Sequence, residues 1–241
     1  MIDSRARHRR GLEFHRRCDG NLVLPVWIAG YHAAMAETVV FVHGIYMVGL
    51  ELTLLRQRVG RAGFATRQFS YRSLTRELGA NARALSLYLQ ALPTERLHLV
   101  AHSLGGLVVL RMFQEGPRLP PGRVVFMGSP VRGSRFARYL GELGLGWSLG
   151  KSGPGTLAAE HAPRWTEARE LGVIAGTHEF RINPLNPKLP SPHDGIVTVE
   201  ETRIEGAKES VTIHSNHTGM LFTRVLAGQV ESFLKRGEFR H

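Results

Sequence analysis

The order of β-rich and helix-like segments after residue 37 constrains the fold most. Short runs of β-branched and apolar residues alternate with longer segments whose apolar residues recur at helical spacing. This alternation is typical of helices packed on a mostly parallel sheet, because parallel strands need a crossover between them. We predict strands at 38–42, 64–71, 97–101, 124–127, 172–176 and 211–214, and helices at 50–59, 77–92, 105–114 and 220–235.

The length of the chain favours one domain spanning residues 37–241. A chain of 241 residues, 43% of them hydrophobic, can bury one sizeable core. Residues 1–36 form an atypical arginine-rich extension, which is either a signal-like segment or sequence before a true start at Met35. Its basic part contains acidic residues and Pro25 interrupts its apolar part, so we expect a cytoplasmic protein rather than a secreted one. No apolar run reaches the ~20 residues of a transmembrane helix.

The formal charge of +11 raises the question of a nucleic-acid partner. The arginines are scattered along the polar faces of the helix-like segments, and no basic run is interleaved with aromatic residues. A solvated arginine-rich surface explains this pattern better, so we expect no nucleic-acid binding. Weak association with anionic surfaces or substrates remains compatible with the charge.

A turn that follows the third predicted strand carries the strongest chemical signal. The strand passes abruptly into a helix through the sequence Ala-His-Ser-Leu-Gly-Gly at 101–106. A turn of this kind holds a serine in strained geometry at a helix N-terminus, and it needs small residues two positions to either side. Ala101 and Gly105 meet that need, although glycine is usual at both positions. Because the strand and the helix are both in place, we predict that Ser103 is a nucleophile rather than a simple helix cap.

The end of the first predicted strand supplies a second signal, in His43, Gly44 and Ile45. The glycine lets the chain curl back, so that the N–H groups of Ile45 and Leu104 can point at one carbonyl oxygen. Two such donors stabilise the negative charge that develops there, and we predict that they form an oxyanion hole. We assign His43 and His102 supporting roles rather than proton transfer.

An acid and a histidine should follow the serine in that order, each after a later strand. Asp194 is the sole aspartate outside the N-terminal extension, and it lies in a Pro-His-Asp-Gly turn. Glu200 and Glu201 are weaker candidates for the acid. For the base we favour His217 over His214, because His214 ends the last strand whereas His217 occupies the free loop. His217 would accept the serine proton, and Asp194 would orient its ring.

With these motifs in place, residues 37–237 resemble the compact, lid-poor lipases and esterases of the α/β-hydrolase superfamily, including the small Bacillus-type lipases. The resemblance implies an α/β-hydrolase fold with a minimal cap or none. It also implies hydrolysis of small-molecule or lipid carboxylic esters through an acyl-enzyme, without cofactor or metal. Two alternatives stay open, because a fold does not fix a function. One is acyl transfer by the same triad, and the other is a non-catalytic binding module.

The long connection between the fourth and fifth predicted strands bears on the cap. We predict a crossover helix in this connection, with 135–143 and 163–170 as the candidates, and little chain is left for a lid. The remaining segment, 144–156, is rich in glycine and suits a mobile flap rather than a packed domain. It resembles a phosphate-binding loop only superficially, because Leu145 stands where that motif needs glycine. Trp147 and Leu149 in this segment are candidates for an apolar acyl site.

Overall fold

The computed structural model describes residues 37–153, 155–158, 160, 162–179 and 189–241, so the extension at 1–36 lies outside the described residues. Six parallel strands form one sheet in the order β2-β1-β3-β4-β5-β6. The prediction of a mostly parallel sheet is therefore confirmed. The strands are β1 (Thr38–Val42), β2 (Ala65–Phe69), β3 (Leu97–His102), β4 (Val124–Met127), β5 (Leu171–Gly176) and β6 (Glu209–Ile213).

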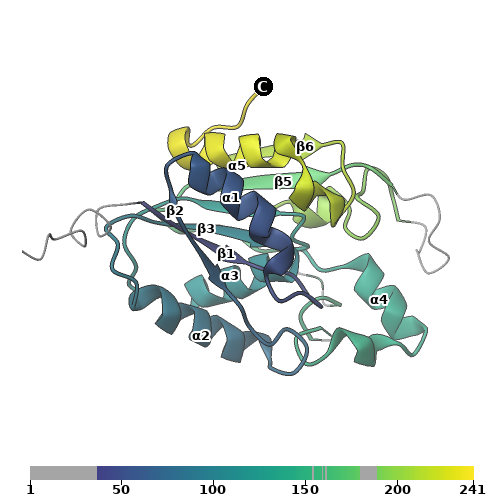
Figure 1. The fold of residues 1–241 in the computed structure, drawn as a ribbon. Helices are drawn as coiled ribbons and strands as arrows, with labels where there is room; N and C mark the ends of the chain where they lie inside the picture. The colour runs from purple at the N-terminus through teal and green to yellow at the C-terminus, as the bar shows by residue number, and fades with distance from the viewer. Residues whose placement is uncertain (1–36, 154, 159, 161, 180–188) are drawn as a thin grey trace, which may run out of the picture.

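Helices cover both faces of the sheet (Figure 1). Helices α1 (Thr53–Arg61) and α5 (Arg224–Arg236) lie on one face, and α2 (Leu78–Gln90) and α3 (Leu104–Gln114) lie on the other. Helix α4 (Arg135–Glu142) lies beyond the ends of the strands. Four short 3₁₀ turns complete the described elements: η1 (Leu50–Leu52), η2 (Gly146–Leu149), η3 (Glu200–Thr202) and η4 (Gly219–Phe222).

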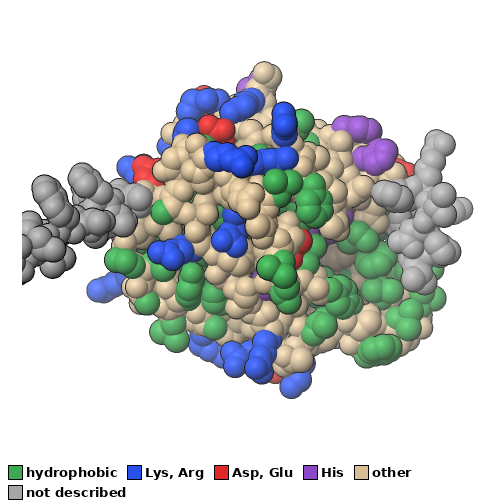
Figure 2. All heavy atoms as spheres, in the orientation of Figure 1, with side chains coloured by type: hydrophobic (Ala, Val, Ile, Leu, Met, Phe, Trp, Pro, Cys, Tyr) green, Lys and Arg blue, Asp and Glu red, His purple; other side chains and the backbone are tan. Residues whose placement is uncertain are grey.

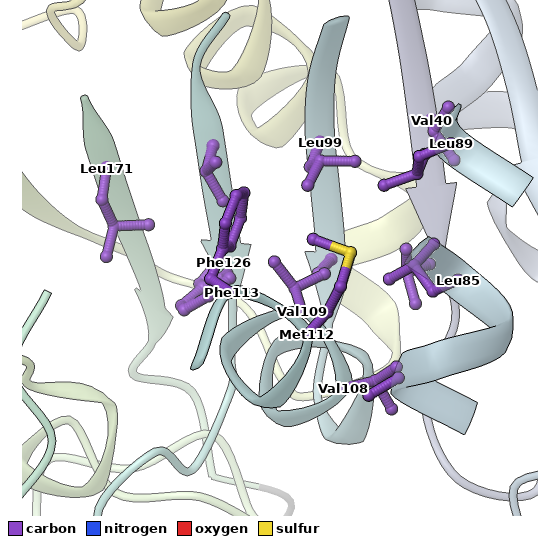
Figure 3. Close-up of a cluster of buried hydrophobic side chains, with 14 of the residues drawn as sticks. Val40, Leu85, Leu89, Leu99, Val108, Val109, Met112, Phe113, Phe126 and Leu171 are labelled. Atoms are coloured by element: carbon purple, nitrogen blue, oxygen red, sulfur yellow. The ribbon is translucent and has the colours of Figure 1, made fainter. Parts of the chain in front are cut away.

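Apolar side chains fill the space on each side of the sheet. Every residue of the four central strands is buried, which explains why these strands are near-continuous apolar runs rather than alternating ones. Figure 3 shows the cluster beneath α2 and α3, where side chains from the strands meet side chains from both helices. Its labelled members are Val40, Leu85, Leu89, Leu99, Val108, Val109, Met112, Phe113, Phe126 and Leu171.

The order of the strands determines where a site can form. From β1 the chain passes to β2 at one edge and then crosses to β3 on the other side of β1. The connections therefore diverge at the carboxyl ends of β1 and β3, and such a divergence leaves a crevice in open α/β sheets. The predicted oxyanion loop follows β1 and the predicted nucleophile follows β3.

Of the two candidates for the crossover helix, 135–143 corresponds to α4 and 163–170 is not helical. In the second segment Arg164 pairs with Glu205 in an isolated parallel bridge, and bends follow at 167–169. Trp165 explains the difference, because its buried ring packs edge-on against Phe113 at 5.2 Å and Phe126 at 6.0 Å. Its indole N–H donates to the Arg169 carbonyl at 2.6 Å, which folds the segment into a loop around the ring. Burial of one aromatic side chain here outweighs local helix propensity.

Other predicted elements also differ in their limits, among them the last strand and the last helix. The last strand runs over 209–213, so it begins earlier than predicted and His214 lies outside it. The helix predicted at 220–235 is divided into η4 and α5 at Thr223, which has extended backbone geometry. The Thr223 hydroxyl accepts a hydrogen bond from the Leu226 N–H, so this residue caps α5.

The connection between β4 and β5 contains α4, as predicted, and its described residues form no large cap. Segment 144–156 forms η2, and Leu149 from this turn is buried in a small cluster with Leu104 and Leu140. Trp147 from the same turn is 78% exposed. The segment therefore covers the start of α3 with Leu149 and presents Trp147 to solvent.

We predict that Gly105→Ala destabilises the fold, because a Cβ there would come within 2.5 Å of the Val42 carbonyl oxygen. Overpacking of this kind costs about 1–3 kcal/mol. Gly141→Ala is the matched control, because a Cβ at this helical glycine meets nothing within 4 Å and alanine favours helix. Urea unfolding should show a lower midpoint for Gly105→Ala and an equal or higher one for Gly141→Ala. Equal stability of the two variants would contradict the prediction.

Candidate active site

Ser103 lies in the sharp turn between β3 and α3, as the sequence predicts. Its backbone has φ 53° and ψ −124°, a conformation that residues other than glycine rarely adopt. The Ser103 N–H donates to the Met127 carbonyl at 3.0 Å, and its carbonyl accepts from the Gly106 N–H at 3.0 Å. These bonds hold the strained residue between the neighbouring strand and the first turn of the helix.

A chain of hydrogen bonds connects Ser103, His217 and Asp194. The Ser103 Oγ lies 3.1 Å from His217 Nε2, and His217 Nδ1 lies 2.7 Å from Asp194 Oδ2. The other carboxylate oxygen of Asp194 accepts from the N–H groups of Ile196 at 3.0 Å and Val197 at 2.7 Å. Because a carboxylate only accepts, Nδ1 carries the imidazole proton. The Nε2 lone pair therefore faces the serine hydroxyl, which is the arrangement that a general base requires.

The backbone of His217 is fixed from two sides. Its N–H donates to the Asp194 carbonyl at 2.9 Å, and its own carbonyl accepts from His102 Nε2 at 3.1 Å. Burial lowers the pKa of His102 to about 3, and the nearby His217 ring contributes to the shift. His102 is thus a neutral donor that holds the His217 loop, which agrees with a supporting role.

The predicted oxyanion residues lie on either side of the serine. Ile45 and Leu104 belong to the same small apolar cluster. A Cβ at Gly44 would lie 3.1 Å from the Ser103 Cβ, so the backbone before Ile45 passes directly beside Ser103. Leu104 begins α3, and the first N–H groups of a helix have no acceptor within it. The Ile45 N–H also has no hydrogen-bond acceptor among the residues that the structure describes.

His43 connects the loop after β1 to the loop after β2. Its Nδ1 bonds to the Gly44 carbonyl at 2.8 Å, and its Nε2 accepts from the Tyr71 N–H at 3.1 Å. The Tyr71 hydroxyl donates back to the His43 carbonyl at 2.8 Å, and the two rings stack at 4.3 Å. Burial lowers the pKa of His43, and the neutral ring stabilises the loop that carries Ile45.

The structure brings none of the rival residues to Ser103. His214 is exposed, and its ring packs edge-on against His178 at 4.7 Å. Glu200 is exposed in η3 and forms ion pairs with two arginines. Glu201 is buried, but its carboxylate accepts from the backbone N–H groups of Thr198 and Arg135.

Two glycines beside Asp194 and His217 were not predicted from the sequence. Gly128 follows β4 with φ 56°, and a Cβ there would come within 3.2 Å of the His217 ring and 3.3 Å of Asp194 Oδ2. Gly176 ends β5, and a Cβ there would come within 2.8 Å of the Asp194 Cβ. Their position in the sequence could have identified them, because each glycine lies at the carboxyl end of a predicted strand, the edge at which the site was expected.

Comparison with known families agrees with the fold. Residues 39–206 match the model of the alpha/beta hydrolase family. The chain belongs to this family. The match includes Ser103 and Asp194, and His217 lies beyond its end. No curated protein matches the chain at a significant level.

Three solved structures show the same fold at low identity. The mature lipase BlEst2 from Bacillus licheniformis is 17% identical with a TM-score of 0.62, over 83% of this chain and 91% of that one. The RedJ thioesterase of prodiginine biosynthesis in Streptomyces coelicolor is 13% identical with a TM-score of 0.57, over 84% and 85%. Carboxylesterase CesB from Bacillus subtilis is 11% identical with a TM-score of 0.54, over 85% of each chain.

The described residues contain no group of three or more histidine, cysteine, aspartate or glutamate side chains that could hold a metal ion. None of their helices is both long enough and apolar enough to cross a membrane.

We predict that burial of His102 makes the free energy of unfolding fall as the pH decreases below about 6.5, the ordinary histidine pKa. Between that pH and a folded pKa of about 3, the unfolded state binds a proton that the folded state does not. The loss from this group approaches about 1.4 kcal/mol per pH unit. Urea unfolding at pH 7 and pH 5 should therefore give a shallower pH dependence for His102→Gln. The exposed-histidine variant His214→Gln should match the wild type, and an equal change in both variants would contradict the prediction.

Proposed function

We propose that this protein is a serine hydrolase that cleaves carboxylic esters through an acyl-enzyme. The observation that carries the proposal is the hydrogen-bond chain from Ser103 through His217 to Asp194, with distances of 3.1 and 2.7 Å. All three residues are buried, so bulk water weakens these contacts little. Membership of the α/β-hydrolase family supports hydrolytic chemistry in general, and the triad geometry supports the acyl-transfer mechanism.

The proposed reaction proceeds in two balanced steps. His217 Nε2 takes the proton of Ser103 as Oγ attacks the ester carbonyl, and the N–H groups of Ile45 and Leu104 stabilise the oxyanion. Collapse of this intermediate breaks the bond to the alcohol oxygen, which receives the proton from the imidazolium. Water then attacks the acyl-enzyme while His217 takes its proton, the bond from the acyl carbon to Oγ breaks to release the carboxylic acid, and the proton returns to Ser103 Oγ. Asp194 stabilises the imidazolium throughout.

The similar structures support esters as the substrate class, since they include a lipase and a carboxylesterase. A thioesterase with the same fold shows that the leaving group can be sulfur in a relative of this architecture. Acyl transfer to another alcohol would use the same residues, and product analysis with added alcohol distinguishes it from hydrolysis. A non-catalytic binding module is disfavoured, because it needs neither an aligned base nor strain at the serine.

Ser103→Ala should leave a folded protein and remove almost all esterase activity, with a loss in kcat of up to about a million-fold if the triad acts as a unit. A fluorophosphonate probe should label the wild type but not this variant. Ser129→Ala is the control, because Ser129 is also buried beside the turn but its hydroxyl has no hydrogen-bond partner among the described residues. Labelling that persists in Ser103→Ala would assign the nucleophile elsewhere.

His217→Ala should abolish turnover of a p-nitrophenyl ester, whereas His214→Ala should retain a substantial fraction of it. The reason is geometric, because only His217 lies within hydrogen-bond distance of Ser103 Oγ and His214 is exposed. Steady-state rates of both variants, with circular dichroism to confirm folding, decide the assignment. A larger loss in His214→Ala would transfer the role of base to that residue.

A further inference from the structure

Exposed large hydrophobic side chains are concentrated at one edge of the molecule. Among the described residues, all of them except Leu87 lie in segments beyond the carboxyl ends of the strands, the edge at which Ser103 lies. Figure 2 shows hydrophobic side chains gathered on the side of the molecule where the strands end. We call this set the apolar rim: Tyr46, Val48, Leu50, Leu74, Leu143, Trp147, Phe222 and Val225.

Cationic side chains are interspersed with the apolar rim. Arg72 and Arg76 flank Leu74 in the loop after β2, and all three are exposed. Arg224 lies between Phe222 and Val225 at the start of α5. Within the described part of the chain, none of these three arginines forms an ion pair with an acidic residue.

Lys151 adds a further cation beside η2. It is exposed, its N–H donates to the Leu74 carbonyl at 2.8 Å, and its ammonium group has no acidic partner among the described residues. The hydrogen bond brings the loop after β2 against the segment that carries Trp147. Unpaired cations therefore accompany exposed apolar tips in three separate segments of this edge.

The apolar rim is also attached to the candidate site. The Tyr46 hydroxyl donates to the Ser148 carbonyl at 2.7 Å, which joins the loop after Ile45 to η2. Leu149 from this turn is buried against Leu104 in the cluster that lines the site, whereas Trp147 points to solvent. A surface that contacts the apolar rim therefore lies next to Ser103.

We propose that the apolar rim docks on an anionic lipid surface. Separate apolar tips carried by different loops can each enter a fluid acyl layer, whereas a rigid protein partner needs a continuous complementary face. Arginine and lysine beside such tips meet the phosphates of anionic lipids, and the formal charge of +11 adds long-range attraction. A symmetric pair of this chain is disfavoured, because it would bring the same unpaired cations of two copies together.

This inference extends the proposed function by identifying esters held at a lipid surface as substrates, but the docking itself does not depend on catalysis. Binding is therefore measured in the Ser103→Ala background, where lipid is not hydrolysed. The probe is a vesicle of phosphatidylcholine containing phosphatidylglycerol, compared with a vesicle of phosphatidylcholine alone. We expect co-sedimentation with the anionic vesicle that weakens as salt increases, and weaker binding to the neutral vesicle. Equal binding to both vesicles, or binding to neither, would overturn the proposal.

Leu50→Ser and Leu87→Ser form a matched pair, because the two leucines are 77% and 71% exposed but only Leu50 belongs to the apolar rim. Leu50→Ser should weaken vesicle binding about tenfold, the loss expected for one inserted leucine, and Leu87→Ser should leave it unchanged. Equal effects of the two substitutions would overturn the proposal. Unfolding midpoints identify any variant that has lost its fold.

A second pair tests the cations. The double variant Arg72→Gln with Arg76→Gln should reduce binding more than the double variant Arg61→Gln with Arg67→Gln, which removes the same charge from exposed residues away from the apolar rim. Equal losses would mean that total charge, not this face, drives association, and would overturn the proposal. So would a dimer in size-exclusion chromatography that Leu50→Ser dissociates, because the rim would then be an interface between copies.

Activity separates this inference from the proposed function. With Ser103 restored, Leu50→Ser should hydrolyse a dissolved short ester at the wild-type rate and a vesicle-borne ester more slowly. Vesicle binding without hydrolysis of any ester would contradict the proposed function and leave the docking surface in place. Hydrolysis of dissolved esters without vesicle binding would contradict the docking surface and leave the proposed function in place.

Discussion

The close approach of α3 to the end of β1 is the constraint on which the site depends. A helix that starts immediately after β3 passes so near the Val42 and His43 carbonyls that a Cβ at Gly105 would lie 2.5 and 2.6 Å from them. This contact requires the turn to reverse sharply, and Ser103 adopts φ 53°, a conformation that residues other than glycine rarely adopt. The packing of α3 on the sheet maintains this backbone strain. Sheet packing therefore presents the hydroxyl at the crevice between β1 and β3.

The other two residues of the candidate triad come from loops at the same edge and are held by backbone contacts as well as by their side chains. The Asp194 carbonyl accepts from the His217 N–H, so the two loops are joined beside the bond between their side chains. His102 holds the far side of the histidine loop, and its burial keeps the ring neutral. Gly128 leaves the space that the His217 ring occupies. The distance from Ser103 to His217 is thus fixed by the relative positions of β3, β4 and β6.

The sequence predicted the features that depend on local signals. Central strands such as β1 and β4 appear as continuous apolar runs, and the turn at Ser103 has its small residues at fixed offsets, so both are recognisable without tertiary information. The non-helical conformation of 163–170 could not be recognised from the sequence. Trp165 in this segment is buried against residues some forty to fifty positions earlier in the chain, and that contact overrides helix propensity. The role of Gly128 is equally non-local, because it depends on the position of the His217 ring, which belongs to the loop after β6. Ser103, Asp194 and His217 could be named from sequence because the order of the motif is known, whereas their spacing required the fold.

One topological fact accounts for both the candidate site and the exposed face around it. In a parallel sheet every loop that follows a strand emerges at the same edge, and these loops are free of the helix packing that buries both faces. Polar groups from β3, β5 and β6 converge there, and the tips of the same loops carry apolar side chains that no part of the described structure covers. Water-exposed leucine, tryptophan and phenylalanine lower the solubility of a folded chain, so their concentration at one edge requires a compensating contact. The unpaired arginines between them restrict that contact to a surface that is apolar beneath and anionic above, which is the arrangement of a lipid leaflet and not of another cationic protein.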